Sequence, residues 1–444
     1  MGCRKEMIIM KFGGSSVGDS SRIASVAQIV KSRYSDNPVV VLSALQGVTD
    51  DLINVAKSSE NPGSRSAKVE EIIKRHHLML TELGLNAESI ANEVGQLRKE
   101  MQELDSGKQL TLQVLDTIMS FGERMSVRIM AACLSSIGAE AKACDSFDIG
   151  LTTDSNFGYA DILPESYSNI REKLSKINVI PVVTGFIGKN KEGEITTMGR
   201  GGSDYTTSIL GAALNAKEIQ IWTNTDGVMT ADPKVVSTAK NIRRLSYAEE
   251  FELEVLGANT LNPRGIKPAM DNNIPVRILN TFNPDHKGTL ISNHSRLKSR
   301  VASITYKNDI NVLSIFAQKA NIKGEFADKV LGLFANNGIP VNILSVESGS
   351  LILTIDEKYD VNRIVKELGK SAKVTMKRNM AQISLVGHRL GMMPRISETL
   401  SESLNTIKIE MIPSPTSEIN RSIMVKEAHM VKAVRLLHNT FFGK

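Results

Sequence analysis

The sequence predicts an α/β protein in which a large, mostly parallel sheet is followed by two smaller β-α-β-β-α-β units. Continuous apolar runs, such as residues 38–43 and 179–185, alternate with helical patterns up to about residue 291. Such runs are typical of parallel strands that helices cover on both faces. From about residue 295 onward, short strands and single helices follow one another in an order that repeats, which indicates an internal duplication.

The first expected strand, residues 7–12, leads directly into a glycine-rich turn and then into a helical pattern that begins at about Asp19. A strand, a glycine turn and a helix together form a cradle for a phosphate group. Lys11 lies at the carboxyl end of this strand, where open α/β sheets bind ligands. No Gly-Lys-Ser or Gly-Lys-Thr follows the glycines, so the turn is not a Walker A loop. From the pattern alone, Lys11 is either a phosphate ligand or a solvated lysine at a strand end.

A second glycine cluster opens the helix that is expected within residues 197–213. Three glycines there permit backbone conformations and close approaches that a side chain would block. Ser203 or Asp204 then takes the N-cap position, beside free N–H groups and the positive end of the helix dipole, and Arg200 lies within the turn. These features together predict an anion site, and the alternative is an ordinary glycine-rich loop capped by Asp204.

Three polar residues elsewhere carry further candidate chemistry. Ser43 ends the apolar run at residues 38–43, and Thr49 precedes the next helical pattern. Their hydroxyls either bind a carboxylate or, for Thr49, cap the helix. Glu123 interrupts an otherwise apolar helical pattern, where a buried carboxylate needs a partner. The adjacent Gly122 leaves room for a ligand, whereas a lone glutamate in a helix is more commonly exposed.

The composition limits the classes of protein that the chain can represent. Its 444 residues are 41% hydrophobic and 23% charged, which is ordinary for a globular protein of two or more domains. No apolar run is long enough to span a bilayer, and residues 1–6 leave no room for a signal peptide before the first strand. Three cysteines without metal-type spacing favour a cytoplasmic protein. The net charge of +6 is spread along the chain, which is compatible with small anionic ligands and gives no sign of a nucleic-acid surface.

The second half of the chain contains two unequal copies of the repeated unit. The first copy, at about residues 310–377, has four expected strands. The second, from residue 382 onward, offers only three, including one at residues 407–412. A sheet edge left unpaired would expose N–H and C=O groups and invite aggregation. The spare strand at residues 301–306 is the expected donor, so we predict that the first copy is inserted within the second.

Several motifs point to a family that the chain resembles. They are Lys11-Phe-Gly-Gly-Ser-Ser-Val17, Gly122-Glu123, Gly185-Phe-Ile-Gly188, Gly199-Arg-Gly-Gly-Ser-Asp-Tyr205, Trp222-Thr223 and Ala231-Asp-Pro-Lys-Val-Val236. With these motifs the chain resembles the aspartokinases over essentially its whole length, and it resembles most their monofunctional, lysine-sensitive class. The resemblance implies an amino-acid-kinase three-layer α/β/α sandwich in residues 1–295, without a homoserine dehydrogenase half. It also implies two ferredoxin-like ACT domains, formed by residues 310–378 and by residues 301–306 with 380–444.

The resemblance implies a reaction that the candidate residues can support. Aspartokinases transfer the γ-phosphoryl group of ATP to the β-carboxylate of L-aspartate, with Mg²⁺, in the first step of lysine, threonine and methionine biosynthesis. Because a carboxylate acceptor is ionised at neutral pH, the reaction needs no general base, but it needs positive charge and oriented N–H groups at the transferring phosphoryl group. The resemblance also implies a homodimer or larger homo-oligomer that binds an amino-acid effector through its ACT domains.

The resemblance assigns roles to individual positions of this chain. The implied catalytic residues are Lys11 and Asp204. The implied aspartate-binding residues are Ser43, Thr49, Glu123, Arg200, Gly201, Gly202 and Ser203. Of these, Arg200 would hold the α-carboxylate and Glu123 the α-amino group. The implied ATP-binding residues are Lys11, Phe12, Gly13, Gly14, Ser15, Ser16, Thr223, Asn224, Met229 and Lys234. The implied effector-binding residues are Phe326, Val341, Asn342 and Glu347.

The chain departs from the family pattern mainly in the part that would bind the nucleotide. The residues that replace a usual aspartate, tyrosine, arginine, lysine and histidine are Asn224, Met229, Lys234, Asn259 and Asn262. Each lost interaction would weaken ATP binding by about 1–2 kcal/mol. Asn342 stands where an aspartate would bind the amino group of a lysine effector, which leaves the effector's identity open. The alternative functions are a catalytically weakened amino-acid sensor and a kinase with another acceptor, such as glutamate or acetylglutamate.

Overall fold

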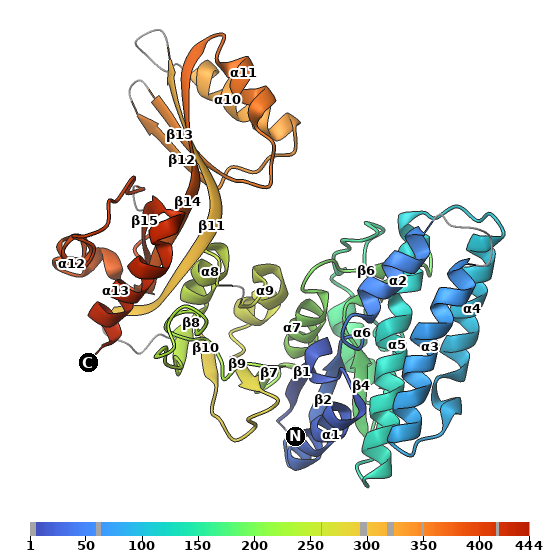
Figure 1. Ribbon diagram of the computed structural model, residues 1–444. Coiled ribbons are helices and arrows are strands. Elements are labelled where there is room, and N and C mark those ends of the chain that lie inside the picture. The colour runs from blue at the N-terminus through green and yellow to red at the C-terminus, as the bar shows by residue number, and fades with distance from the viewer. Residues whose placement is uncertain are drawn as a thin grey trace. The chain divides into compact units, whose positions relative to one another are not determined.

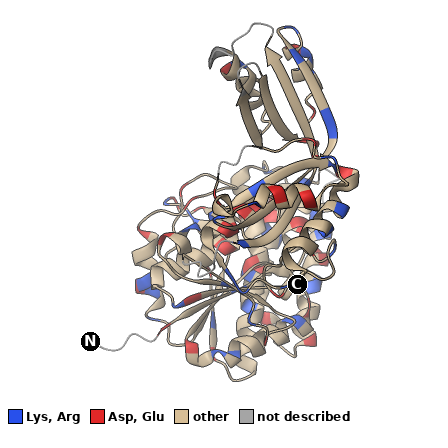
Figure 2. Cartoon of the chain, turned by 90° about the vertical axis from the view of Figure 1, so that its left-hand side faces the viewer, with Lys and Arg blue, Asp and Glu red and all other residues tan. Residues whose placement is uncertain are grey.

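The computed structural model describes residues 6–58, 64–258, 260–293, 300–317, 324–347, 350–413 and 417–443. The chain forms two compact units, each with its own large sheet (Figure 1). The N-terminal unit comprises Met1–Val228, Asn241–Tyr247 and Leu261–His294, and the C-terminal unit comprises Met229–Lys240, Ala248–Thr260 and Ser295–Lys444. Basic and acidic side chains are interspersed over both units (Figure 2). Within the described parts of the chain, no helix is both long and apolar enough to cross a membrane.

An eight-stranded, mostly parallel sheet forms the centre of the N-terminal unit, as the sequence predicts. Its spatial order is β3-β4-β2-β1-β7-β9-β10-β8. The strands are β1 (Ile8–Phe12), β2 (Pro38–Leu42), β3 (Ala141–Cys144), β4 (Ile180–Thr184), β7 (Glu218–Thr223), β8 (Arg244–Ser246), β9 (Val276–Asn280) and β10 (Thr289–Ser292). All neighbouring pairs are parallel except β9 with β10.

Helices cover both faces of this sheet (Figure 1). They are α1 (Ser20–Ser32), α2 (Val48–Lys57), α3 (Ser64–Glu82), α4 (Ala91–Asp105), α5 (Leu112–Ser136), α6 (Ser166–Leu174), α7 (Gly202–Leu214) and α9 (Pro263–Asp271). A separate antiparallel pair consists of β5 (Ile187–Lys189) and β6 (Ile195–Thr197).

Successive side chains of a strand point to opposite faces. Met10 and Phe12 of β1 therefore join the core formed with α1, α2 and α5, and Lys11 points to the other face, where β1 contacts α7.

The C-terminal unit is built on a five-stranded antiparallel sheet of order β12-β13-β11-β14-β15. Its strands are β11 (Arg300–Ala317), β12 (Ile343–Glu347), β13 (Ser350–Asp356), β14 (Ala372–His388) and β15 (Asn420–Lys426). Its helices are α10 (Gly324–Asn336), α11 (Asn362–Leu368), α12 (Ile396–Ser403) and α13 (Met430–Phe442), and most of α8 (Tyr247–Val255) also belongs to it. The strand expected at residues 407–412 is wrong, because only a single bridge joins Met411 to Met424.

Two long strands, β11 and β14, run through both halves of this sheet. The first part of β11 pairs with the second part of β14, as in Thr305 opposite Ser384. Its second part, from Ile310 to Phe316, pairs with β13 on one side and with the start of β14 on the other. The register shifts near Asp309, whose φ of 55° is left-handed. Residues 301–306 thus lie beside the strand that begins the second copy.

Two segments before residue 295 pack with the C-terminal unit, which differs from the sequence-based division of the chain. In Met229–Lys240, Val235 and Val236 join a core that includes Ile304, Ile383 and Val434. The Oη of Tyr306 donates to Asp232 Oδ2 at 2.9 Å, in the same segment. The sequence pattern could not show this, because the contacts join residues that are far apart in the chain.

Candidate active site

The glycine cluster before α7 has the backbone that the sequence predicts but a different cap. The N-cap residue is Gly201, with a φ of 77°, and Ser203 and Asp204 lie in the first turn instead. Gly199 also has a left-handed φ of 71°, a conformation that L side chains rarely adopt. A Cβ atom at Gly202 would lie 2.8 Å from Phe186 Cδ2. The three glycines therefore allow a tight loop whose N–H groups lie at the start of the helix.

Lys11 and Asp204 form an ion pair at the carboxyl end of β1. Lys11 Nζ lies 2.7 Å from Asp204 Oδ1, and the two side chains are only 13% and 15% exposed. The alternation of β1 side chains brings Lys11 to the α7 face, and the early position of Asp204 in α7 brings its carboxylate to the lysine. An ammonium held this way has a fixed position and free donors for an anion.

Glu123 is buried in α5, and its side chain lines the same cavity as Lys11 and Asp204. It is 3% exposed, and its Oε1 accepts a hydrogen bond from the Ala44 N–H at 3.1 Å. Its Oε2 has no hydrogen-bond partner among the described residues. Burial raises the pKa of Glu123 to about 8, and the bond from Ala44 only partly opposes this effect. A Cβ atom at Gly122 would lie 2.8 Å from Ala44 Cβ, so the glycine permits the close approach of this loop.

These side chains line one cavity of about 310 Å³ in the N-terminal unit. Its lining residues are Lys11, Ser43, Thr49, Glu123, Phe186, Gly199, Arg200, Gly201, Gly202, Ser203 and Asp204. Ser43 Oγ donates to Ser203 Oγ at 3.0 Å. Beside the Lys11–Asp204 ion pair, the exposed Arg200 and the buried carboxyl of Glu123 offer one further charged group of each sign to a ligand. One site for an anion and one for a cation match a free amino acid.

Phe186 is the lining side chain that the sequence analysis missed. Its motif was recognised, but nothing in the spacing of Gly185-Phe-Ile-Gly188 assigns the ring to a cavity. The structure gives Phe186 a left-handed φ of 69° and holds its N–H on Thr206 Oγ1 at 3.1 Å. A phenylalanine with a positive φ is uncommon and marks a functional or strained position.

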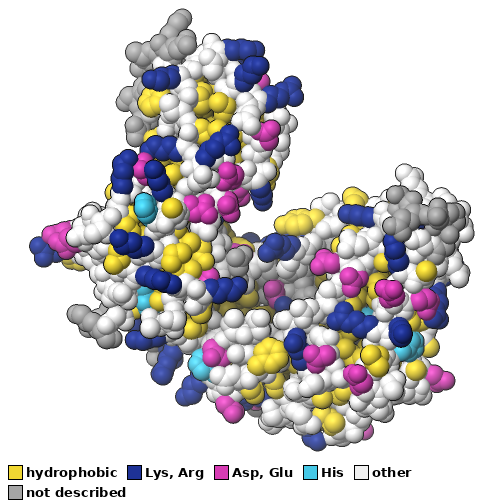
Figure 3. Space-filling model, viewed as in Figure 1, with side chains coloured by type: hydrophobic (Ala, Val, Ile, Leu, Met, Phe, Trp, Pro, Cys, Tyr) yellow, Lys and Arg dark blue, Asp and Glu magenta, His cyan; other side chains and the backbone are white. Residues whose placement is uncertain are grey.

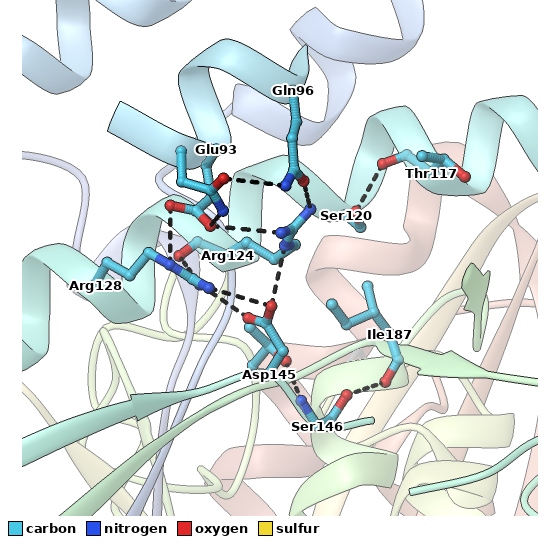
Figure 4. Close-up of polar contacts among 11 residues, drawn as sticks. Glu93, Gln96, Thr117, Ser120, Arg124, Arg128, Asp145, Ser146 and Ile187 are labelled. Atoms are coloured by element: carbon cyan, nitrogen blue, oxygen red, sulfur yellow. Dashed lines mark hydrogen bonds and ion pairs between the residues drawn. The ribbon is translucent and has the colours of Figure 1, made fainter. Parts of the chain in front are cut away.

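Arg124, which follows Glu123 in α5, and Arg128, one turn further on, form an ion cluster with Glu93 of α4 and with Asp145, which follows β3 (Figure 4). Arg124 pairs with Asp145 at 3.1 Å and with Glu93 at 3.4 Å, and Arg128 pairs with each of them at 2.9 Å. Both carboxylates are almost fully buried, and the two positive charges balance the two negative ones. Ser146 follows Asp145 and donates to the Ile187 carbonyl at 2.5 Å, next to Phe186. The cluster thus ties α5 to a second wall of the cavity.

The glycine turn after β1 closes against the loop that follows β2. Gly14–Ser16 form a short 3-10 turn, and a Cβ atom at Gly14 would lie 2.9 Å from the Ala44 carbonyl oxygen. Phe12 is fully buried and stacks on Trp222, with ring centroids 5.6 Å apart. Ser16 is also fully buried, and its Oγ lies 2.8 Å from Thr281 Oγ1. Phe12 and Ser16 therefore support the turn, and only their backbone is left to face a phosphate.

The residues expected to bind the rest of ATP belong to different units. Thr223 ends β7, with its Oγ1 accepting from the Thr225 N–H at 3.2 Å, and Asn224 is exposed after it. Met229 and Lys234 lie in the C-terminal unit, where the Met229 carbonyl accepts from Ser303 Oγ at 2.8 Å. Asn259 lies outside the described residues.

Asn262, the other asparagine in the departing segment, lies in the N-terminal unit beside the glycine loop before α7. It caps α9 through a bond from the Arg264 N–H at 3.0 Å, and its Cβ would lie 2.8 Å from a Cβ atom at Gly201.

The expected effector residues lie at the β12 side of the C-terminal sheet. Phe326 and Val341 pack partly buried against the core that includes Phe334 and Leu353. Asn342 Nδ2 donates to Asp356 Oδ1 at 2.6 Å, and Lys307 Nζ lies 2.8 Å from the same oxygen. Burial alone would raise the pKa of Asp356, but the bonds from Lys307 and Asn342 together hold it below its usual range. The side chain of Glu347 lies outside the described part of the structure.

A charged cavity at the carboxyl ends of a mostly parallel sheet is the arrangement expected of an amino acid kinase. The model of the amino acid kinase family matches residues 6–280, and that of an ACT domain matches residues 383–441. The chain belongs to this family and, within it, to the aspartokinases.

Relatives and solved structures agree with this assignment. The chloroplastic aspartokinase 3 of Arabidopsis thaliana is 35% identical over 463 residues, which cover 99% of this chain and 82% of the relative. The crystal structure of E. coli aspartokinase III with aspartate and ADP is 28% identical, with a TM-score of 0.81, and covers 98% of this chain and 100% of that one. The structure of the same enzyme with lysine and aspartate is 27% identical, with a TM-score of 0.84, over 98% and 99% of the two chains.

Proposed function

We propose that this aspartokinase transfers the γ-phosphoryl group of ATP to the β-carboxylate of L-aspartate in the described cavity. The observation that carries the proposal is the pair of open charges, Glu123 and Arg200, beside the Lys11–Asp204 ion pair. Arg200 takes the α-carboxylate of aspartate in a two-pronged contact, and Glu123 takes the α-ammonium through its free Oε2. The hydroxyl groups of Ser43, Thr49 and Ser203 also line the cavity around the substrate.

Positive charge and oriented N–H groups promote the transfer by stabilising the phosphoryl group as it moves. The β-carboxylate is already ionised at neutral pH, so no residue has to remove a proton from it. Lys11 binds the phosphates, and its ion pair with Asp204 holds the ammonium in position. The N–H groups at the start of α7 and in the turn of Gly13, Gly14 and Ser15 stabilise the negative charge that develops on the phosphoryl oxygens.

Mg²⁺ would be held at this site together with the phosphates of the nucleotide. Among the described residues, no group of three or more His, Cys, Asp or Glu side chains could hold a metal ion. Magnesium is commonly held by one or two carboxylates together with substrate phosphates. Asp204 is the carboxylate nearest to Lys11, and it would offer the protein's contact to a metal that arrives with ATP.

The C-terminal unit is the proposed regulatory part. We take residues 310–378 as one ACT domain, inserted in a second one formed by residues 301–306 and 380–444, because β11 and β14 pair along both halves. Phe326, Val341, Asn342 and Glu347 would bind the amino-acid effector. Met229 and Lys234, which are expected at ATP, belong to this same unit.

We also propose a homodimer formed through the edge strand β12. Leu344 and Val346 of this strand are exposed, and hydrophobic side chains gather on the surface of this part of the C-terminal unit (Figure 3). An exposed apolar edge strand invites pairing with a second chain. A Leu344→Lys/Val346→Lys variant should sediment as a smaller particle than the unchanged chain, and equal sedimentation would exclude this edge. The buried free thiols of Cys133 and Cys144 support a reducing, cytoplasmic location.

An assay of ADP release tests the proposed reaction. The purified full chain is given ATP and Mg²⁺ with L-aspartate, L-glutamate or acetylglutamate, and we expect turnover with aspartate alone. Acetylglutamate should fail because its blocked amino group carries no charge for Glu123. Binding of aspartate by calorimetry without any ADP release would favour the amino-acid sensor, and turnover with another acceptor would replace aspartate as the substrate.

A further inference from the structure

We propose that Arg264 is a positioning residue that holds the loop of residues 198–202 in the conformation that presents Arg200 to aspartate. The inference rests on the proposed function, because the loop lines the same cavity. Arg264 lies in the first turn of α9 and is not itself a lining residue. Arg264 therefore acts on the reaction only through residues that it contacts, among which Met198 begins this loop.

The guanidinium of Arg264 donates hydrogen bonds both to the start of this loop and to the segment of Ala160 and Asp161. Nη1 donates to the Met198 carbonyl at 2.6 Å, immediately before Gly199. Nη2 donates to the Ala160 carbonyl at 2.5 Å and to Asp161 Oδ1 at 2.6 Å. The side chain is 19% exposed. A planar guanidinium can hold several acceptors in one fixed geometry, which the single ammonium of a lysine cannot reproduce.

A stack of side chains extends from Arg264 to the residue beside Arg200. The guanidinium carbon lies 3.9 Å from the ring centroid of Tyr159 and 4.8 Å from that of Tyr205. A Cβ atom at Gly199 would lie 2.5 Å from Tyr159 Cδ2, so the tyrosine ring rests directly on that glycine. Arg264, Tyr159 and Gly199 therefore form one packed series that ends next to Arg200.

The neighbours of Arg264 in α9 contact the same loop. Asn262 Nδ2 donates to the Arg200 carbonyl at 3.4 Å, and a Cβ atom at Gly201 would lie 2.8 Å from Asn262 Cβ. At Gly265, a Cβ atom would lie 3.1 Å from Asp204 Cβ. The N-cap and first turn of α9 thus contact the loop at Met198, Arg200 and Gly201, and also contact Asp204 in the first turn of α7. The Arg200 residue itself is exposed, so the supported backbone sets the place from which its guanidinium reaches a ligand.

Kinetics can distinguish this role from a contribution to stability alone. The glycine turn after β1 is held by other residues, such as Arg22, whose Nη1 donates to the Ser15 carbonyl at 2.9 Å. A loss of Arg264 should therefore raise the KM for aspartate and leave the KM for ATP nearly unchanged. General destabilisation of the unit would affect both substrates.

The experiment compares Arg264→Met and Arg264→Lys with Arg277→Met in the full chain. Arg277 is a matched control, because it also pairs with a carboxylate in this unit, Glu218, at 2.8 Å, but it does not line or support the cavity loop. We expect Arg264→Met to raise the KM for aspartate about tenfold, Arg264→Lys to lie between it and the unchanged chain, and Arg277→Met to change neither KM by more than about twofold. An aspartate KM within twofold of normal in Arg264→Met, or an equal rise in the KM for ATP, would overturn the proposal.

A second pair of variants serves if Arg264→Met does not fold. Tyr159→Ala removes the ring between Arg264 and Gly199, and Tyr34→Ala removes a tyrosine of similar exposure, 54% against 52%, elsewhere in the unit. Tyr159→Ala should raise the KM for aspartate about fivefold relative to Tyr34→Ala, and equal values would overturn the proposal. If the unchanged chain releases no ADP with aspartate, the proposed function fails instead, so the two failures are distinguishable.

Discussion

The charge of Glu123 should control the affinity for aspartate, because burial raises the pH at which this carboxyl loses its proton. Its pKa is raised to about 8, so the neutral form predominates below that pH and the carboxylate above it. Only the carboxylate can pair with the substrate's ammonium. We expect the KM for aspartate to fall about tenfold per pH unit as the pH rises from about 6 towards 8, and then to level off.

Glu123→Gln provides the control for this pH dependence. Its amide cannot ionise, so the KM for aspartate should be high and nearly independent of pH. A flat profile in the unchanged chain, or the same slope in Glu123→Gln, would show that another group titrates.

The ion pair of Lys11 and Asp204 should matter for the transfer step. Removing a contact to the transferring group costs about 3 kcal/mol, so Lys11→Ala and Asp204→Ala should each lower kcat roughly a hundredfold. Lys217→Ala is the control, because it breaks an exposed lysine–carboxylate pair with Glu6. The single tryptophan, Trp222, is buried in the N-terminal unit and reports by fluorescence whether that unit stays folded. Near-normal turnover in either variant would remove that residue from the mechanism.

Residue types in the sequence predicted the charged groups of the cavity, but not the backbone that presents them. Lys11, Glu123 and Arg200 were all expected at the site, and all three line one cavity. The cap of α7 was expected at Ser203 or Asp204 and is Gly201, because a pattern of residue types does not reveal a left-handed φ. Phe186 was missed for the same reason.

At the scale of elements, α5 joins the cavity to the ion cluster of Glu93, Arg124, Arg128 and Asp145. Removing one partner of a buried ion pair leaves an uncompensated charge, so Asp145→Asn should lower the free energy of unfolding by about 3 kcal/mol. Glu70→Gln is a matched control on the surface, where Arg98 pairs with a half-exposed carboxylate, and it should cost less than about 1 kcal/mol. Urea unfolding followed by Trp222 fluorescence measures both, and equal losses would mean that the cluster stabilises no more than a surface pair.

Periodicity predicted most elements but could not show how they combine. The apolar runs at residues 38–43 and 179–185 became β2 and β4, side by side in the sheet. The cluster itself was not predicted, because Glu93, Arg124 and Asp145 come from three elements and meet only in the fold.

At the scale of the whole molecule, the repeated order of strands and helices predicted that residues 301–306 complete the sheet of the second copy, and these residues pair with the second part of β14. A count of strands was enough for this, because an incomplete sheet needs a further strand. The same reasoning gave no sign that Met229–Lys240 and Ala248–Thr260 pack with the C-terminal unit. Their contacts, such as Arg435 Nε to the Val235 carbonyl at 2.9 Å, join residues about 200 positions apart.

The pairing of β11 with β14 allows the proposed inserted domain to be removed cleanly. Lys307 lies opposite Gln382, so residues 308–381 can be replaced by a two-residue Asn-Gly turn that closes a hairpin between them. The remaining sheet keeps the pairing of residues 301–307 with the end of β14, and of β14 with β15. The core of Ile304, Ile383, Leu385 and Val434 is also kept.

We expect this shortened chain to fold, to release ADP with aspartate at a rate within about fivefold of the full chain, and to lose inhibition by L-lysine or L-threonine, whichever inhibits the full chain. The expected effector residues Phe326, Val341, Asn342 and Glu347 are all removed with the insert. A control chain with the same Asn-Gly turn in place of residues 415–416, between α12 and β15, keeps both halves and should keep its inhibition. Aggregation or inactivity of the shortened chain alone would show that the two halves fold as one inseparable domain, and retained inhibition would place the effector elsewhere.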